Sequence, residues 1–405
     1  MKAPTHFTVI EGNSSGYLML IGFLGVFLAM GLGSAYFMEH HGHVVTGMNN
    51  QIVWGMPHVF AVFLIVCASG ALNVASISSV FSKASYKPLA RLSGLLAIAL
   101  LVGGLAILVL DLGRPDRLII AMTHYNFKSI FAWNIYLYTG FLAIVAIYLW
   151  MMMERRYNKY TKHAGSVAFV WRLILTTGTG SIFGFLVARE AYDSAIMAPM
   201  FIVMSFSFGL AVFILVMLAI YNGTQRPIGM HIINRLKNLL GVFVAGALLL
   251  VVIFHLTKLY VTRLHGVEAF ILSDGGIITT LFWLGQIVLG SIVPLCLLYL
   301  PVFKDNLKAV IASSVLVILG GLSAMYVIII GGQAYPLDLF PGYEVKSSFY
   351  DGAINSYTPS TPEVLLGLGG IAIAGLIVTL GIKFLQFTPT SLADADVDPH
   401  HKAEN

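Results

Sequence analysis

Hydrophobic residues in this chain gather into ten long runs that alternate with short polar segments. Each run has about the 20 apolar residues that an α-helix needs to cross a bilayer. Within the runs the apolar residues follow one another without the alternation of a barrel strand, which favours helices. The pattern predicts an all-α polytopic membrane protein with ten transmembrane helices. The predicted spans cover residues 15–38, 52–80, 92–111, 129–152, 166–188, 195–221, 238–258, 277–300, 308–331 and 363–385.

The composition of the whole chain excludes the soluble classes of protein. Of its 405 residues, 58% are hydrophobic and 10% are Asp, Glu, Lys or Arg. An ordinary soluble domain carries about 25% charged residues. These values exclude a soluble globular protein, a coiled coil and a disordered chain. The net charge of +5 does not indicate nucleic acid as a partner, because Lys and Arg in a membrane protein report its orientation.

The basic residues are divided unequally between the two ends of the spans. Cytoplasmic loops carry the excess of Lys and Arg, so we expect both termini in the cytoplasm and the odd-numbered loops outside. The first run is too long for the apolar part of a signal peptide, and we expect it to be retained as a helix. Of the 23 basic residues, 15 lie at the predicted inner end: Lys2, Lys83, Lys87, Arg91, Arg155, Arg156, Lys159, Lys162, Arg226, Arg235, Lys237, Lys304, Lys308, Lys383 and Lys402. Seven lie at the outer end: Arg114, Arg117, Lys128, Arg189, Lys258, Arg263 and Lys346.

Cysteine usage gives no motif for a tightly bound redox metal. The two cysteines, Cys67 and Cys296, both lie inside apolar runs, and the sequence has no C-x-x-C, no C-x-x-C-H and no phosphate-binding loop. We therefore expect no metal site, no iron–sulfur cluster and no covalently attached haem in this protein. The acidic tail from Leu392 to Asn405 contains His400 and His401, and we interpret it as solvated and disordered rather than metal-binding.

The second run carries polar residues along one side of its predicted helix. Measured from His58 on a helical wheel, Ser69, Asn73 and Ser76 fall within about 60°, and Trp54 lies about 40° to the other side. Polar side chains are costly in lipid, so this stripe should face other helices. For Ser69, Asn73 and Ser76 two interpretations stay open: hydrogen bonds between helices, or a candidate proton path. His58 is a candidate proton-exchanging group, because a titratable ring within a span is rarely without a function.

A carboxylate, Asp111, ends the third run, and Arg114 and Arg117 follow it closely. Such a carboxylate either forms an interfacial ion pair at the end of the helix or belongs to a buried proton site. Asn134 lies early in the fourth run, and Tyr138 follows one helical turn later.

Most other polar residues also lie near the outer ends of the spans. Arg172 is an exception, about six residues into the fifth run, and we interpret it as an anchor that reaches the cytoplasmic interface. A titratable cluster below the outer surface, walled by Trp and Tyr, suits a quinone, whose carbonyls need hydrogen-bond donors and whose reduction needs protons. The remaining members of this cluster are His124, Arg189, Glu190, Asp193 and His255.

At these residues the sequence resembles a known family. Trp54–Pro57 (Trp-Gly-Met-Pro), Asp111–Arg117 (Asp-Leu-Gly-Arg-Pro-Asp-Arg) and Ser129–Trp133 (Ser-x-x-x-Trp) are similar to motifs of the NrfD/PsrC family. That family comprises the quinone-reactive membrane subunits of polysulfide reductase-like complexes. With ten predicted spans, the protein is most similar to the ten-helix branch, which includes the HybB, ActC and DsrP types, and within it to DsrP of the DsrMKJOP complex.

The resemblance implies an organisation in two four-helix bundles, formed by spans 2–5 and 6–9, with peripheral first and last helices. A long loop such as the one at 332–362, rich in Pro, Gly, Tyr and Ser, is usually a docking surface or a lid. The implied segments are 1–51 (N-terminal segment, first helix and outer loop), 52–188 (first bundle with the quinone site), 189–331 (second bundle), 332–362 (long outer loop) and 363–405 (last helix and cytoplasmic tail).

The resemblance also implies a function: a quinone/quinol-reactive subunit of a respiratory redox complex of sulfur metabolism, in a bacterial or archaeal cytoplasmic membrane. Menaquinone or ubiquinone would be its exchangeable substrate, and the subunit would hold no redox centre of its own. Its partners would be an outer ferredoxin-like iron–sulfur subunit, a multihaem cytochrome c, further membrane and cytoplasmic subunits, and lipid. The matching positions make His58 and Asp111 the expected catalytic residues. The expected quinone-binding residues are Trp54, His58, Asp111, Arg114, Asn134 and Tyr138.

Two other classes of function stay open. Ten spans with scattered glycine permit a secondary transporter, although transporters favour polar sites near the membrane midplane. A b-type cytochrome would use His58 and His255 as axial ligands of haem.

Overall fold

The computed structural model describes residues 6–337 and 352–398. Predictions that involve Lys2, Lys346, His400, His401 and Lys402 fall outside this part of the protein, as does the middle of the loop at 332–362.

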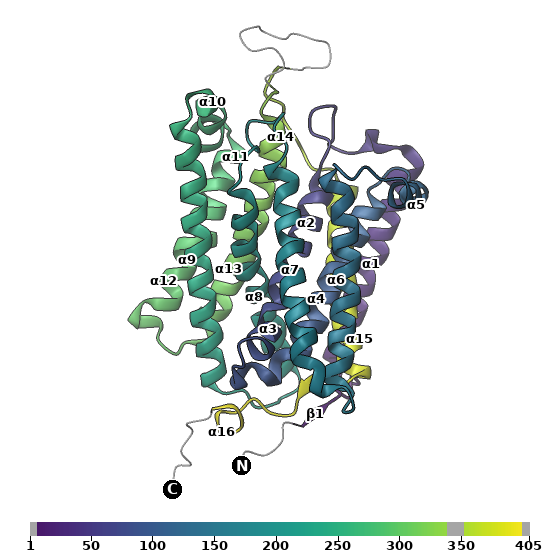
Figure 1. Ribbon diagram of the computed structural model, residues 1–405, viewed down its shortest axis with the longest axis vertical. Helices are drawn as coiled ribbons and strands as arrows, with labels where there is room; N and C mark the ends of the chain where they lie inside the picture. Colours follow the sequence, from purple (N-terminus) through teal and green to yellow (C-terminus); the bar gives the residue numbers. More distant parts are fainter. Residues whose placement is uncertain (1–5, 338–351, 399–405) are drawn as a thin grey trace.

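In the part of the protein that the structure describes, ten helices are long and apolar enough to cross a membrane. The predicted fold class, an all-α polytopic membrane protein with ten spans, is therefore confirmed (Figure 1). The spans are α1 (Ser15–His41), α2 with α3 (Met56–Ala71, Asn73–Ser79), α4 (Ala90–Leu110), α6 (Ile130–Met153), α7 (Thr161–Gly184), α8 (Met197–Gly223), α9 (Met230–Tyr260), α11 with η7 and α12 (Ile277–Thr280, Leu281–Ile292, Val293–Tyr299), α13 with η9 and α14 (Leu307–Tyr326, Val327–Gly331, Gly332–Ala334), and α15 (Thr361–Phe384).

Several helices begin earlier than their apolar runs. Helix α9 starts at Met230, ahead of the run predicted from 238, because the segment with Arg235 and Lys237 continues the helix beyond the apolar part. An apolar run measures the crossing of the bilayer, whereas the helix extends into the interface. Local caps fix other starts: Ser14 Oγ accepts a hydrogen bond from the Tyr17 N–H at the start of α1.

Short elements mark the two ends of the bundle. The strands β1 (Phe7–Thr8) and β2 (Thr388–Pro389) pair antiparallel at one end, named here the ribbon end. Short helices α5 (Leu118–Thr123) and α10 (His265–Ala269) lie at the opposite, distal end (Figure 1). The remaining short turns are η1 (His43–Val45), η2 (Ala84–Leu89), η3 (Pro115–Arg117), η4 (Asn158–Tyr160), η5 (Thr262–Leu264), η6 (Phe270–Asp274) and η8 (Pro301–Phe303).

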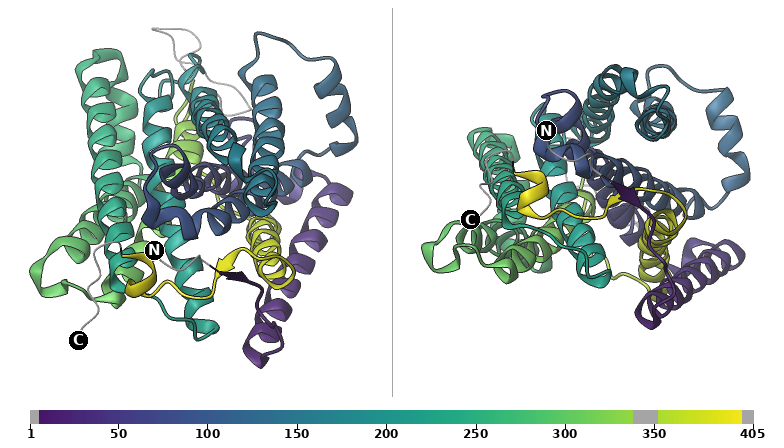
Figure 2. Two further views of the ribbon diagram at one scale, coloured as in Figure 1. Left: turned by 60° about the horizontal axis from the view of Figure 1, so that its bottom comes forward. Right: turned by 90° about the horizontal axis from the view of Figure 1, so that it is seen from below.

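Helices α2 and α8 form the centre of the packing. Helix α2 packs against α4 and α8, and α8 packs in turn against α7, α9 and α13. Gly70 and Gly209 allow the close approach of α2 and α8: a Cβ atom at Gly70 would lie 1.6 Å from the Ser205 carbonyl oxygen. Helices α1 and α15 lie side by side at one edge (Figure 2). The division into two four-helix bundles stays a prediction.

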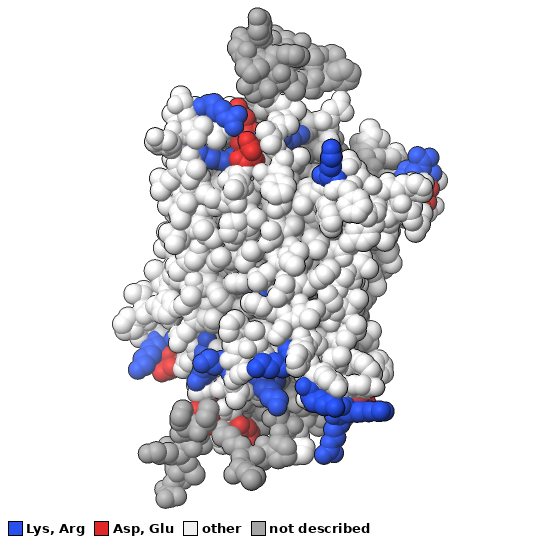
Figure 3. All heavy atoms as spheres, in the orientation of Figure 1, with Lys and Arg blue, Asp and Glu red and all other residues white. Residues whose placement is uncertain are grey.

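Charged residues are placed as a membrane requires. On the face drawn in Figure 3, they gather at the two ends of the molecule, and the broad band between them is almost free of charge. A hydrocarbon layer about 30 Å thick tolerates few charges, so this band is the membrane-embedded surface. The protein is a multi-pass membrane protein. The cytoplasmic placement of both termini stays a prediction.

The described part of the C-terminal tail is ordered, so its interpretation as a disordered segment was wrong there. Helix α16 (Asp394–Val397) follows the buried Leu392. Asp394 accepts a hydrogen bond from the His231 N–H at 2.9 Å, which ties the tail to the start of α9. Capping of a helix start by a carboxylate explains this contact, and the acidic composition alone did not reveal it.

Candidate functional site

The structure brings His58 and Asp111 together at the distal end. Asp111 caps the C-terminus of α4, and His58 lies in the first turn of α2, behind Pro57. His58 Nδ1 lies 3.1 Å from Asp111 Oδ2, and the Asp111 side chain is 1% exposed against 25% for His58. The contact is outside hydrogen-bond geometry, and neither oxygen of Asp111 has a hydrogen-bond partner among the described residues. Such contacts often tighten only when a ligand is bound.

Trp54 forms an aromatic wall beside His58. The two rings are stacked, with centroids 6.2 Å apart and an angle of 24° between their planes. The indole also contacts Phe131 of α6 at 5.7 Å and Phe183 of α7 at 5.9 Å. The distal ends of α2, α6 and α7 therefore meet at one half-buried indole ring.

Asn134 and Tyr138 lie on the buried face of α6. Asn134 Nδ2 donates to the carbonyl oxygens of Ile130 at 2.9 Å and Gly178 at 3.1 Å. Asn134 Oδ1 is buried without a hydrogen-bond partner among the described residues. The hydroxyl of Tyr138 lies 3.4 Å from Thr179 Oγ1. An unpaired buried amide oxygen is costly, and it can accept a hydrogen bond from a ligand hydroxyl.

Arg114 lies apart from this group. Its guanidinium donates two hydrogen bonds to Asp116, at 3.0 and 2.9 Å, and both side chains are exposed. The hydrogen bonds with Asp116 raise the pKa of Arg114. The exposed ion pair leaves Asp111 with His58 as its ionisable contact in the described structure.

Two residues that the sequence did not single out, Gln333 and Glu363, hold the entry to α2. Gln333 Oε1 accepts hydrogen bonds from the backbone N–H groups of Val53 and Trp54, each at 3.0 Å, and Gln333 Nε2 donates to the Trp54 carbonyl. These contacts span about 280 positions of the sequence, so no local pattern reveals them. Gln333 therefore fixes the backbone that carries Trp54.

Glu363 supports the same segment from α15. Its fully buried carboxylate accepts hydrogen bonds from the Gly47 N–H at 2.8 Å and the Tyr357 hydroxyl at 2.7 Å. Tyr357 in turn accepts a hydrogen bond from the Met56 N–H at 2.6 Å. Burial and the contact with Glu363 raise the pKa of Tyr357. A capping box, Ser360 with Glu363, was the sequence signal that could have identified this carboxylate.

Arg189 connects the segment before α2 with the end of α14 at the distal end. Its guanidinium donates to the carbonyl oxygens of Gln51 at 2.7 Å and Gln333 at 3.0 Å. Burial lowers the pKa of this guanidinium. Arg189 is thus a positioning residue for the segment before α2.

Below this site, Ser69 and Asn73 belong to a polar network with α7. Thr176 Oγ1 donates to Ser69 Oγ at 2.6 Å, and an Arg172 guanidinium nitrogen donates to Asn73 Oδ1 at 2.8 Å. Among the described residues, the Ser76 hydroxyl donates to the Leu72 carbonyl, one turn earlier in the chain, at 3.1 Å. The proton path through these side chains stays a prediction.

The interpretation of Arg172 as an interfacial anchor was wrong. The side chain is fully buried, and its guanidinium lies 4.8 Å from the Phe169 ring and 4.9 Å from the Phe206 ring. The guanidinium also donates a hydrogen bond to Asn73 Oδ1 at 2.8 Å, so the side chain points into the protein. A side chain held among other helices in this way does not extend to the interface.

The outer polar cluster divides into separate groups. His255 of α9 lies beside Glu268 of α10, with His255 Nδ1 2.7 Å from Glu268 Oε2. The buried Lys258 donates to the backbone carbonyl of Glu190. Asp193 forms an ion pair with Arg263 at 3.3 Å. His124 is exposed and contacts Thr123. In the described residues, no group of three or more His, Cys, Asp or Glu could hold a metal ion.

Comparison with known proteins identifies the family. The model of the family described as "Polysulphide reductase, NrfD" matches residues 44–336, which is more than half of the sequence. The chain belongs to this family. The membership expected from the motifs around Trp54 and Asp111 is therefore confirmed.

Several relatives of this NrfD-family protein have names that describe subunits of membrane enzymes. The Hdr-like menaquinol oxidoreductase integral membrane subunit of Archaeoglobus fulgidus is 29% identical, over 97% of this protein and 99% of the relative. The integral membrane subunit of menaquinone reductase from Nitratidesulfovibrio vulgaris is 21% identical, over 93% of each protein. The C subunit of polysulfide reductase from Wolinella succinogenes is 22% identical, over 71% of this protein and 96% of the relative.

Proposed function

We propose that this protein is the quinone-reactive membrane subunit of a respiratory redox complex. The observation that carries the proposal is the contact of His58 with the buried Asp111 carboxylate at the distal end. The relatives named for menaquinol and menaquinone support the choice of ligand. Family membership also favours a redox subunit over the transporter and the b-type cytochrome.

The residues around His58 suit a quinone head. A quinone takes up two electrons and two protons when it is reduced to the quinol, so its two oxygens need partners that donate and accept protons. The Asp111 carboxylate and Asn134 Oδ1 are buried without hydrogen bonds in the described structure, and Trp54 offers a flat wall. His58, Asn134 and Trp54 would hold the head. Arg114 is a weaker candidate, because it is exposed and already paired with Asp116.

His58 is arranged to exchange a proton. Its Nδ1 faces Asp111, and no described residue hydrogen-bonds to Nε2. Once ligand binding tightens this contact, the carboxylate receives the Nδ1 proton and fixes the tautomer in which Nε2 accepts a proton. Asp111 then stabilises the imidazolium that forms. In this proposal His58 is the catalytic residue at the ligand, and Asp111 acts with it as the group that orients the ring and takes part in proton exchange.

The partners follow from the same proposal. Electrons would cross to a ferredoxin-like iron–sulfur subunit at the distal side, with a multihaem cytochrome c and further membrane and cytoplasmic subunits in the complex. The relative named for polysulfide reductase supports a role in sulfur metabolism, and the proposed complex is of the DsrMKJOP type, in which this protein would take the place of DsrP. We place the distal end outside, in agreement with the excess of basic residues at the ribbon end.

A binding titration tests the site. The purified protein in detergent is titrated with a short-tailed naphthoquinone, as wild type, His58→Ala and His124→Ala. His124 is the matched control, because it is an exposed histidine at the same end. We expect His58→Ala to weaken saturable binding at one site tenfold or more, about 1.4 kcal/mol, and His124→Ala to bind as the wild type does. Equal binding by all three proteins would remove His58 from the site.

A further inference from the structure

A second histidine–carboxylate pair lies at the distal end, on different helices from the first. His255 Nδ1 is 2.7 Å from Glu268 Oε2, and the Glu268 side chain is fully buried. Glu268 Oε1 has no hydrogen-bond partner among the described residues. As with His58, the carboxylate faces Nδ1, and no described residue hydrogen-bonds to Nε2 of His255. The Nε2 edge is therefore available to a ligand.

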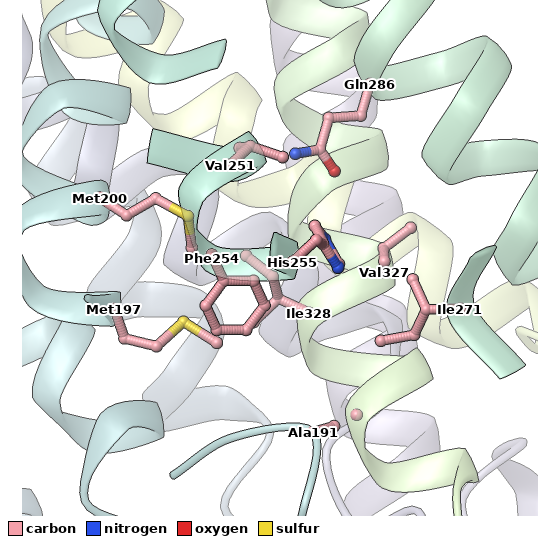
Figure 4. A pocket seen from close by; sticks show the side chains of 11 residues that line it. Ala191, Met197, Met200, Val251, Phe254, His255, Ile271, Gln286, Val327 and Ile328 are labelled. Atoms are coloured by element: carbon pink, nitrogen blue, oxygen red, sulfur yellow. The ribbon is translucent and has the colours of Figure 1, made fainter. Parts of the chain in front are cut away.

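This histidine lines a small, mainly apolar cavity between α8, α9, η7 and η9. Figure 4 shows the His255 ring and the Gln286 amide among side chains that are otherwise apolar. Ligand sites in proteins have this character: mostly hydrophobic walls with a few polar groups that orient the ligand. The apolar lining includes Met197, Met200, Val251, Phe254, Ile271 and Val327.

Gln286 is the second observation that points to a ligand. Its side chain is 8% exposed, and its amide makes no hydrogen bond with a described residue. Lipid offers such an amide no hydrogen-bond partner, so the amide depends on water or a ligand in the cavity. The amide can donate to one ligand oxygen and accept from another. Gln286 therefore suits a ligand with a hydrogen-bonding head.

The cavity continues toward the membrane middle. A second small cavity shares Val251 and Gln286 with the first and is also lined by Ala247 and Val244 of α9. Ala247 and Val244 lie about two to three turns nearer the ribbon end than His255. Its walls are again largely apolar. The two cavities adjoin at Val251 and Gln286, and the second offers a mainly apolar space beside the first.

Both walls beside His255 depart from regular α-helix. Gln286 lies in the π-helical segment η7, and Val327 and Ile328 lie in the π-helical segment η9. π-helical turns are rare and frequently occur at functional sites. Here they widen two neighbouring spans at the position of the cavity.

The lining limits the chemistry of the head. It contains no Lys or Arg, so an anionic lipid phosphate or fatty-acid carboxylate would lack a counter-charge. We propose that the cavity at His255 and Gln286 is a second binding site for an isoprenoid quinone or quinol, separate from the site at His58. The choice of quinone among neutral amphiphiles rests on the proposed function.

The test is the stoichiometry of quinone binding to the full-length protein in detergent. A short-tailed naphthoquinone is titrated into the wild type, Val251→Trp, which fills the cavity, and Gln286→Leu, which removes the amide at similar volume. Val252→Trp is the matched control, because Val252 is the next residue on α9 and is 44% exposed on the lipid-facing side. Melting curves of each variant show that it is folded.

We expect two saturable sites in the wild type and in Val252→Trp. Val251→Trp should lose one site, Gln286→Leu should weaken one site tenfold or more, and His58→Ala should affect the other. A single wild-type site that only His58→Ala removes, or two sites that survive both cavity variants, would overturn the proposal. Loss of binding in Val251→Trp with normal binding in His58→Ala would support this site and contradict the His58 site. Absence of any saturable binding, or a retained neutral lipid that naphthoquinone does not displace, would also overturn it.

Discussion

His58 Nδ1 and Asp111 Oδ2 lie 3.1 Å apart, although 53 positions separate the two residues in the sequence. The distal ends of α2 and α4 bring them together, and the carboxylate is buried while the ring is partly exposed. The pair therefore has one edge in the protein interior and one edge open to a ligand.

Replacing Asp111 by Asn should strongly reduce quinol turnover in the assembled complex. Asn keeps the volume but cannot stabilise the imidazolium, and positioned acid–base groups contribute about 10²- to 10⁴-fold to rates. We expect a decrease of at least about 100-fold with an unchanged melting temperature. Asp116→Asn, which changes an exposed carboxylate five positions on, should leave turnover unchanged. Normal turnover in Asp111→Asn would show that the carboxylate has no part in the chemistry.

Gly70→Ala and Gly209→Ala should lower the melting temperature of the protein. A Cβ at Gly70 would meet the Ser205 carbonyl oxygen at 1.6 Å, and one at Gly209 would meet the Ala71 nitrogen at 2.3 Å. Overpacking of this kind costs about 1–3 kcal/mol. Gly223→Ala on α8 is the control, because a Cβ there has nothing within 4 Å. If all three variants have the same melting temperature, α2 and α8 are not in close contact.

Asn73 and Arg172 should be coupled in a double-mutant cycle. Asn73→Leu removes the amide oxygen that accepts from the buried guanidinium, and hydrogen bonds to charged groups contribute about 1.5–3 kcal/mol. The double variant Asn73→Leu/Arg172→Met should lose less free energy of unfolding than the two single variants lose in sum. The difference should be about 1–3 kcal/mol. Denaturation in detergent gives the free energy of unfolding of the wild type, the two single variants and the double variant. Additive effects would mean that Asn73 does not compensate the buried charge.

Gln333→Leu should loosen the backbone before α2. Gln333 Oε1 accepts from the N–H groups of Val53 and Trp54, so hydrogen exchange at these two amides should accelerate tenfold or more, about 1.4 kcal/mol. Naphthoquinone affinity should fall as well, because Trp54 is then less fixed. Gln386→Leu, at the exposed ribbon end, is the control. Unchanged exchange at Val53 and Trp54 would contradict the positioning role.

The sequence allowed the spans to be predicted because hydrophobic burial in a bilayer depends on local composition. The same pattern placed His58 and Asp111 at one end, which made their contact foreseeable. It did not reveal Gln333, or the contact of Glu363 with Gly47, because these partners lie hundreds of positions away. The direction of the Arg172 side chain was misjudged, since Asn73 and Phe206, which contact its guanidinium, lie on other helices. Glu268, the partner of His255, also escaped notice, because it lies in a short helix between two spans.

The most direct test of the account is photo-crosslinking with an azido-naphthoquinone, followed by mass spectrometry of the labelled peptides. The account predicts label on the segment Trp54–His58 or on the distal turns of α6 around Asn134, and its loss when unlabelled naphthoquinone is added. Label near His255 would come from the second site and would not count as label at the His58 site. Absence of competable label from both Trp54–His58 and the Asn134 region would contradict the assignment of quinone binding to His58 and Asp111.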